Sequence, residues 1–160
     1  MLEGEPARPA AIDAPPSSQR WALGVEYDGS AFHGFQQQAT AEATVQRALQ
    51  QALTQVAAHP VQVVCAGRTD AGVHATVQVV HFDSPARRDA SAWVRGTNSL
   101  GPEGVSVCWA SPVPQHFHAR FSARARRYLY LLAEGPTRFA IGRDHVTRVR
   151  HAVDVHAMHD

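Results

Sequence analysis

The sequence predicts an α+β fold in which helices pack on one face of a mostly antiparallel sheet. Its hydrophobic patterns read, in order, as strand, helix, strand, strand, helix, strand and strand, with turn signals between them. The chain has 160 residues, of which 44% are hydrophobic and 18% charged. That balance is typical of a folded protein, and a chain of this length buries roughly 70% of the surface that it exposes when unfolded. We therefore expect a single α+β domain with a sizeable core.

The first strand and helix follow a proline-rich start. Residues 1–19 lack periodicity and predict a disordered tail, so the folded domain is expected over 20–160. Residues 21–27 alternate as a half-buried strand and run into the turn signal Asp28-Gly29-Ser30. Thr44 is a candidate N-cap for a helix from Val45 to about Ala58. Apolar residues recur there at helical spacing and predict one buried face, formed by Val45, Leu49, Leu53 and Val56.

The remaining elements are shorter. VQVVCA (61–66) and VQVVHF (77–82) predict two strands on either side of a turn over 67–72. A second helix is expected over 89–97, with Ala92, Trp93 and Val94 as core candidates. VSVCWA (105–110) predicts a further strand, and a long strand is expected over 124–133. Together these elements give the strand and helix order of the predicted fold.

Several classes of protein are excluded or disfavoured by simple features. No apolar run approaches the roughly 18 residues of a membrane-spanning helix, so an integral membrane protein is excluded. The N-terminus has prolines and early acids but no apolar signal core, which argues against secretion. Two cysteines, Cys65 and Cys108, are too few for a disulfide scaffold. We expect a cytoplasmic protein in which Cys65 is a buried structural thiol.

Basic residues are unevenly distributed along the chain. All 15 are arginines, and the overall formal charge is only +1. Residues 1–86 carry a net charge of −4, residues 87–150 carry +7, and residues 151–160 carry −2. Genome composition explains the choice of arginine over lysine but not this clustering. A basic second half predicts a polyanionic partner on one face, and the planar guanidinium suits phosphate.

The stretch CAGRTDAGVHA (65–75) carries the clearest chemical signal. Gly67 and Gly72 bracket a sharp turn and permit close approach of another molecule. Arg68 and Asp70 are two residues apart, so on an extended segment both side chains can point to one side. An arginine beside a carboxylate keeps it ionised and oriented, as a nucleophile or general base requires. A surface turn with an incidental Arg–Asp pair is the alternative.

GRTDAGVHA (67–75) resembles the active-site motif of the tRNA pseudouridine synthase A family, and further blocks match in the right order. Upstream, GVEYDGSAFHGFQQQ (24–38) is similar to the family's first strand and loop. Downstream, the matching blocks are VQVVHFD, Thr97-Asn98-x-Leu100, FHARFSA (117–123) and RRYLY (126–130). Phe35 stands where tryptophan is common and Gln37 where arginine is common. The resemblance covers about 20–160 and implies the N-terminal half of the pseudouridine synthase fold.

The resemblance also implies three catalytic residues. Asp70 matches the aspartate that attacks or deprotonates the target nucleoside while the C1′–N1 glycosidic bond breaks. Arg68 matches the arginine that pairs with this carboxylate and helps to hold the flipped nucleotide. Tyr128 matches the tyrosine that packs against the target base, although the residues alone favour a core tyrosine of a strand. Uracil is detached, rotated and rejoined through C5, and the reaction needs no cofactor.

Other side chains are candidates for contact with RNA. The arginines beside the proposed pocket suit phosphate, although each taken singly also fits a solvated strand face. Two glutamines suit RNA contact or a polar linker, and one histidine lies in a matching block; the full set is Arg120, Arg124, Arg126, Arg127, Gln36, Gln38 and His118. The chain has ten histidines, but the spacings of His116, His118, His151, His156 and His159 match no strong zinc pattern. No metal and no cofactor are expected.

The expected function follows from the resemblance. It implies a tRNA pseudouridine synthase that converts uridine to pseudouridine at positions 38, 39 and 40 of the anticodon stem-loop. Family members have two similarly folded halves and act as homodimers, and this chain corresponds to the first half. The alternative is a truncated half-domain that binds tRNA without turnover. We expect tRNA as the partner in either case, and no membrane.

Overall fold

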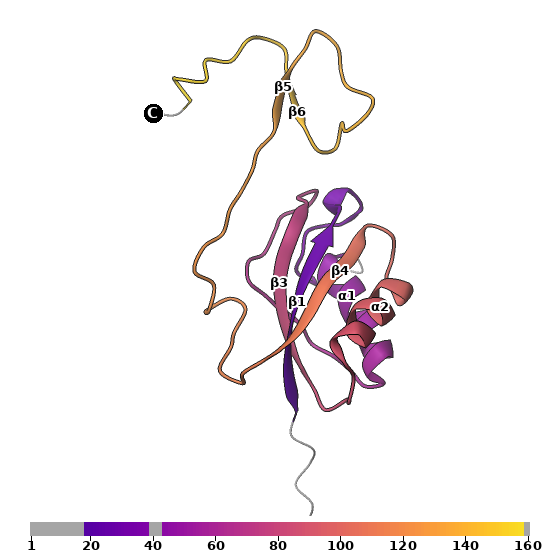
Figure 1. The fold of residues 1–160 in the computed structure, drawn as a ribbon. Helices are drawn as coiled ribbons and strands as arrows, with labels where there is room; N and C mark the ends of the chain where they lie inside the picture. Colours follow the sequence, from indigo (N-terminus) through magenta and orange to yellow (C-terminus); the bar gives the residue numbers. More distant parts are fainter. Residues whose placement is uncertain (1–17, 39–42, 159–160) are drawn as a thin grey trace, which may run out of the picture.

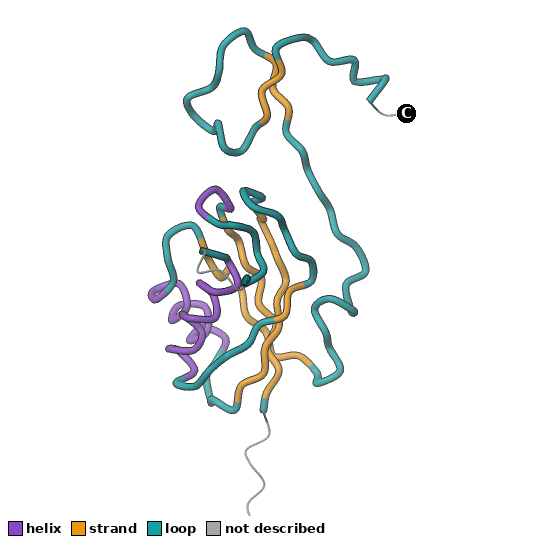
Figure 2. The backbone as a smooth tube through the Cα atoms, turned by 180° about the vertical axis from the view of Figure 1, so that it is seen from behind, coloured by secondary structure: helices purple, strands orange, loops and turns teal. Residues whose placement is uncertain are grey.

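The computed structural model describes residues 18–38 and 43–158. Its main body is a four-stranded antiparallel sheet in the order β2-β3-β1-β4. These strands are β1 (Gln19–Tyr27), β2 (Val64–Cys65), β3 (Ala75–Ser84) and β4 (Val105–Val113). Two helices, α1 (Val45–Ala57) and α2 (Ala90–Leu100), cover one face of the sheet (Figure 1, Figure 2). The α+β fold with helices on one face is confirmed.

Strand β1 lies at the centre of the sheet and supplies much of the core. Leu23 is fully buried and pairs with Val80 of β3 on one side and Ala110 of β4 on the other. Alternate residues of β1 face the helices, because successive side chains of a strand point to opposite faces. Trp93 of α2 packs between Trp21 and Phe82, with ring centroids 5.9 and 5.0 Å away. The core therefore sits between β1 and the two helices.

Both helices begin where the sequence predicts. The Thr44 side chain accepts a hydrogen bond from Arg47 N–H at the start of α1, and Asp89 accepts one from Ala92 N–H at the start of α2. Each cap satisfies one backbone donor that the first helical turn leaves open. The helix expected over 89–97 extends to Leu100, and of its three core candidates only Trp93 is fully buried. The Thr44 cap is confirmed, whereas the Asp89 cap was not predicted.

The strand expected over 61–66 is much shorter than its pattern suggests. Only Val64–Cys65 pairs, with His81 and Val80 of β3. The preceding backbone forms hydrogen bonds with side chains of α1 instead. Val61 N–H donates to the Thr54 hydroxyl, and Val63 N–H donates to the side-chain amide oxygen of Gln50. Val61 and Val63 are buried all the same. An apolar run predicts burial, but it does not say whether the partner is a strand or a helix.

The long strand expected over 124–133 is wrong. Residues 123–131 are extended without strand pairing, and only β5 (Leu132–Glu134) forms, in a parallel pair with β6 (Thr147–Val149). Figure 1 shows this pair apart from the four-stranded sheet, at the end of a long connection from β4. Tyr128 and Leu129 are 77% and 83% exposed. A strand needs an adjacent strand for its backbone groups, and residues 124–131 pair with none.

Two further expectations concern the ends and the membrane. The tail expected over 1–19 falls mostly outside the described residues, and Gln19 already belongs to β1. Within the described ranges, no helix has the length and apolar character needed to cross a bilayer.

Candidate active site

The loop between β2 and β3 carries the motif residues and lies against the loop that follows β1. Phe35 N–H donates to Thr69 O at 3.0 Å, and Gly72 N–H donates to Phe32 O at 3.3 Å. The Tyr27 and Thr69 hydroxyl groups are 2.9 Å apart. These contacts link the two matching blocks of sequence across the fold. The motif loop is therefore held at several points rather than left free.

Glycines permit this close approach. Gly34 has φ of +83°, and a Cβ atom there would lie 2.8 Å from the carbonyl oxygen of Thr69. Gly72 has φ of +77°, a left-handed conformation that other residues adopt at a cost. Both glycines of the motif region thus have a geometric reason, which the sequence anticipated for Gly72 only in general terms.

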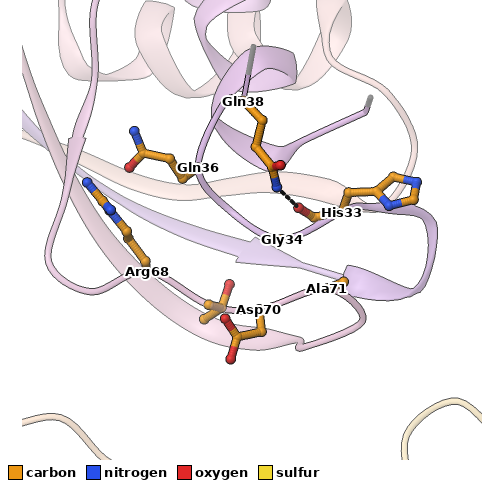
Figure 3. A pocket seen from close by; sticks show the side chains of 8 residues that line it. His33, Gly34, Gln36, Gln38, Arg68, Asp70 and Ala71 are labelled. Carbon is orange, nitrogen blue, oxygen red and sulfur yellow. Dashed lines mark hydrogen bonds between the residues drawn. The ribbon is translucent and has the colours of Figure 1, made fainter. Parts of the chain in front are cut away.

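A hollow of about 250 Å³ opens between the two loops. Figure 3 shows the side chains that line it, which come from the loop after β1 and from the motif loop: His33, Gly34, Gln36, Gln38, Arg68, Thr69, Asp70 and Ala71. Four sequence candidates therefore meet here, namely Asp70, Arg68, Gln36 and Gln38. Asp70 and Arg68 are both exposed, so a ligand can reach them from solvent.

Arg68 and Asp70 do not form the expected pair in this structure. Within residues 18–38 and 43–158, no hydrogen bond or ion pair joins them. Arg68 extends toward Gln36, whereas the Asp70 carboxylate points to the other side of the loop (Figure 3). The two-residue spacing places both side chains on one side only in a regular strand, and residues 68–70 lie in a loop between a bend at 66–67 and a turn at 71–72. The carboxylate and the guanidinium both remain available to a ligand.

Tyr128 lies beside the motif but outside the hollow. Its hydroxyl is 3.9 Å from the position that a Cβ atom on Gly67 would occupy. Arg126 fixes this approach, since its guanidinium donates to Ala66 O from Nε at 3.1 Å and from Nη2 at 2.6 Å. Arg126 Nη2 also donates to Arg120 O at 3.2 Å. The segment 120–128 is thus pinned to the base of the motif loop.

The other RNA candidates divide into two kinds. Arg124 and Arg127 are exposed side chains, and Arg120 is exposed with its guanidinium 5.8 Å from the Phe121 ring. His118 instead stabilises its own turn: its Nδ1 accepts from Arg120 N–H and Phe121 N–H, and its ring stacks on Phe121. Arg120, Arg124 and Arg127 are therefore placed to meet a ligand, whereas His118 acts first on the backbone.

Some residues at the site were missed by the sequence reasoning. Gln78 of β3 is buried, and its amide donates to Gly67 O while its carbonyl oxygen accepts from Gly67 N–H at 3.4 Å. His74 accepts from Gly29 N–H at Nδ1, 3.2 Å away. His74 lies inside the quoted motif, so its position was a usable signal. Gln78 lies in the matching block VQVVHFD, but its contact with Gly67 depends on the register of β3, which the sequence does not specify.

Cys65 precedes the motif and is half-buried. Burial raises the pKa of its thiol, although the nearby charges of Arg68 and Arg120 act in the opposite direction. A thiol that stays protonated is a poor nucleophile. The expectation of a structural cysteine agrees with this environment.

Comparison with known proteins places the chain in a family. The sequence profile of a tRNA pseudouridine synthase family matches residues 24–122, which is more than half of the chain. This chain belongs to the tRNA pseudouridine synthase family. The matched range includes both loops that form the hollow.

Individual relatives agree with this assignment. The tRNA pseudouridine synthase A of Dechloromonas aromatica is 56% identical over 141 residues, which are 88% of this chain and 53% of that protein. Enzymes of the same name from Stenotrophomonas maltophilia and Pseudomonas aeruginosa are 53% and 50% identical, over 88% and 94% of this chain and 55% and 53% of theirs. The chain spans about half the length of the curated relatives that it matches.

Proposed function

We propose that this chain carries the catalytic loop of a tRNA pseudouridine synthase that isomerises uridine to pseudouridine at positions 38, 39 and 40 of the anticodon stem-loop. The observation that carries the proposal is the position of Asp70. Its carboxylate is exposed at a hollow whose walls are backbone-anchored loops. Catalytic groups need such fixed supports, because small misplacements cost large factors in rate.

Asp70 can act only on a uridine that has left the base stack of the RNA. The sugar of a stacked nucleotide is not accessible, so the target uridine is extruded from the stack into the hollow. Asp70 then attacks or deprotonates the ribose as the C1′–N1 bond breaks, and the freed uracil rotates. A C1′–C5 bond forms as C1′ releases the Asp70 oxygen, or as the deprotonated ribose takes its proton back. One proton then leaves C5 to solvent, and one is taken up at N1. Atoms are conserved, so the step is an isomerisation and calls for no redox cofactor.

Arg68 and Tyr128 contact the extruded nucleotide once it is bound. Arg68 extends along the hollow toward Gln36, so its guanidinium can meet a phosphate or sugar of the extruded nucleotide. Tyr128 reaches the motif at Gly67, on the flank of the loop. Its exposed ring offers a flat surface on which a base can stack.

Phosphate contacts come from arginines at the exposed segment after β4. Arg120, Arg124 and Arg127 are exposed there, close to the point where Arg126 binds the base of the motif loop. Contacts of this kind position a folded RNA without reading its sequence. Gln36 and Gln38 line the hollow itself and suit hydrogen bonds to the extruded base or its neighbours.

The test is release of tritium from tRNA labelled at uridine C5, measured with this chain and two variants. We expect release by the unmodified chain and none with Asp70→Asn, which removes the charge while keeping the volume. Asp154→Asn is the matched control, since Asp154 caps a surface turn outside the hollow. Equal release by Asp70→Asn and the unmodified chain would reject the role of Asp70.

The second candidate is a half-domain that binds tRNA without turnover. It is supported by the length of the chain, which spans about half of the relatives. A tRNA-binding measurement on the same samples separates the two candidates. Binding without tritium release favours the half-domain, release that depends on Asp70 favours the synthase, and the absence of both excludes each of them.

A further inference from the structure

Three potential metal ligands meet at the end of the sheet beside the motif loop. Asp28 directly follows β1 and His74 directly precedes β3, and Tyr27 pairs with Ala75 across the two strands. Antiparallel pairing therefore brings Asp28 and His74 to the same end of the sheet. His145, from the connection between β5 and β6, joins them. No local sequence pattern indicates this cluster, because its members are 46 and 71 residues apart in the chain.

The spacing within the cluster fits a small divalent ion. One ligand atom from each of the three residues lies within 4.8 Å of the other two. His74 Nδ1 is 3.1 Å from Asp28 Oδ1, and His145 Nε2 is 3.9 Å from Asp28 Oδ2. Ligands at about 2.1 Å from a tetrahedral Zn²⁺ lie about 3.4 Å apart. The two printed separations, 3.1 and 3.9 Å, lie on either side of that value.

His74 Nδ1 faces two groups with opposite needs. It accepts from Gly29 N–H at 3.2 Å, which requires a lone pair, yet Asp28 Oδ1 lies 3.1 Å away and would require a proton there. One nitrogen cannot satisfy both groups in either protonation state. A cation beside Asp28 would neutralise the carboxylate charge that faces His74 Nδ1. Binding it through Nδ1 would take over the lone pair that now accepts from Gly29 N–H.

The surroundings are those of a metal ligand set. His74 Nε2 lies 2.8 Å from the backbone oxygen of Asp144 and 3.1 Å from His145 Nδ1, so an N–H on Nε2 can donate to either. Metal-bound histidines usually donate their other N–H to such a partner. Binding one ion through His74 Nδ1 and His145 Nε2 requires the His145 ring to turn its Nδ1 away from His74 Nε2, because both nitrogens would then carry a proton. Ser30 N–H donates to Asp28 Oδ1 at 2.9 Å, and this bonding lowers the pKa of Asp28 and keeps it ionised. About half of the Asp28 and His145 side-chain surface is exposed, which leaves room for a water ligand.

We propose that Asp28, His74 and His145 bind one Zn²⁺ or a similar divalent ion, with water completing the coordination. Two histidines and a carboxylate are a ligand set that zinc commonly takes. The ion fastens the β5–β6 connection to the strand ends that flank the motif loop. This site is separate from the hollow around Asp70, and it stands or falls independently of the proposed synthase activity.

The experiment is a zinc titration of the whole chain, with competition by a chromophoric chelator. We expect one Zn²⁺ per chain that survives dialysis, and a thermal midpoint that rises when zinc is added, since ligand binding to the folded state stabilises it. His145→Ala should weaken zinc binding at least tenfold while the chain stays folded, because His145 lies outside the core. Co²⁺ in place of Zn²⁺ should give the strong visible absorption of a tetrahedral site.

His116→Ala is the matched control, since His116 is an exposed histidine outside the cluster. Zinc affinity should be unchanged in this variant. The proposal is overturned if the unmodified chain retains no stoichiometric zinc. It is equally overturned if His145→Ala binds zinc as tightly as the unmodified chain, because the ion would then sit on other histidines.

Discussion

Strand β1 and the segment over residues 124–133 have similar sequence patterns and different fates. Both are rich in residues that favour strands, and both were predicted as strands. Strand β1 pairs with β3 and β4, and its Leu23 is fully buried, whereas Leu129 of the later segment is 83% exposed. The comparison teaches that strand propensity becomes a strand only where a neighbouring edge supplies backbone partners.

The two regions are also held by different forces. Strand β1 is fixed by ladders on both sides and by a shared hydrophobic core with α1 and α2. The later segment is attached through Arg126, whose guanidinium binds Ala66 O. A region with few buried contacts contributes little to the free energy of unfolding and opens easily. The variants below measure this difference.

The largest expected effect comes from the same truncation made in each region. Leu23→Ala should lower the free energy of unfolding by about 2–5 kcal/mol, because it leaves a cavity in the core. Leu129→Ala should change it by less than about 0.5 kcal/mol, because the side chain is exposed. Urea denaturation followed by fluorescence of the core tryptophans measures both. A large loss for Leu129→Ala would show that the segment packs in solution.

An intermediate effect is expected from Gly34→Ala compared with Gly142→Ala. Both glycines have positive φ, +83° and +70°, so each substitution strains the backbone by about 1–2 kcal/mol. At Gly34 the new Cβ also meets Thr69 O, while at Gly142 nothing lies within 4 Å. In the same urea experiment, Gly34→Ala should destabilise the body and Gly142→Ala should not. Equal losses would mean that the β5–β6 connection unfolds together with the sheet.

The smallest expected effect concerns a surface ion pair. The Arg20 guanidinium donates to both Asp83 oxygens at 2.8 and 2.7 Å, which lowers the pKa of Asp83 despite partial burial. With the folded pKa below the unfolded value of about 3.9, the pair stabilises the fold above that pH and loses its effect as pH falls through the folded pKa. Since Asp83 is 41% exposed, the gain is under about 1 kcal/mol.

Asp83→Asn should therefore cost a fraction of that free energy near pH 7 and nothing once the wild-type carboxyl is protonated. Urea midpoints measured from pH 7 down to pH 3 give this profile. Asp144→Asn is the comparison in the later segment, where Arg143 Nε lies 3.4 Å from Asp144 and both side chains are more exposed. A cost for Asp83→Asn that persisted at acid pH would point to lost packing rather than lost charge.

Local features of the fold were predictable because their causes are local. Thr44 and Asp89 cap helices through bonds to residues three positions ahead, so the sequence contains both partners. The strand over 61–66 failed for the opposite reason, since Gln50 and Thr54 of α1 capture its backbone N–H groups. The apolar residues of 61–66 do not indicate that the hydrogen-bond partner is a helix. Hydrogen bonds within one helical turn can be predicted from the local sequence. Competition between distant hydrogen-bond partners cannot.

The candidate site shows the same division. The motif alone identified Asp70, Arg68 and the loop that carries them, and both side chains line the hollow. The structure decided that Arg68 and Asp70 point apart, because residues 68–70 form a loop and not a regular strand. It also decided that Tyr128 is exposed, and that the Gln78 side chain forms hydrogen bonds with the backbone of Gly67. Each of these depends on the path of the backbone through space.

The sequence by itself determined the α+β class, the family, the Thr44 helix cap and the identity of the motif loop. These follow from periodicity, short-range hydrogen bonds and an ordered set of motifs, all of which are properties of neighbouring residues. Only the tertiary structure decided which apolar runs become strands, which side of the loop Asp70 faces, and that Asp28, His74 and His145 meet. The physical reason is that strand register and loop closure join residues far apart in the chain, where no local pattern fixes the partner.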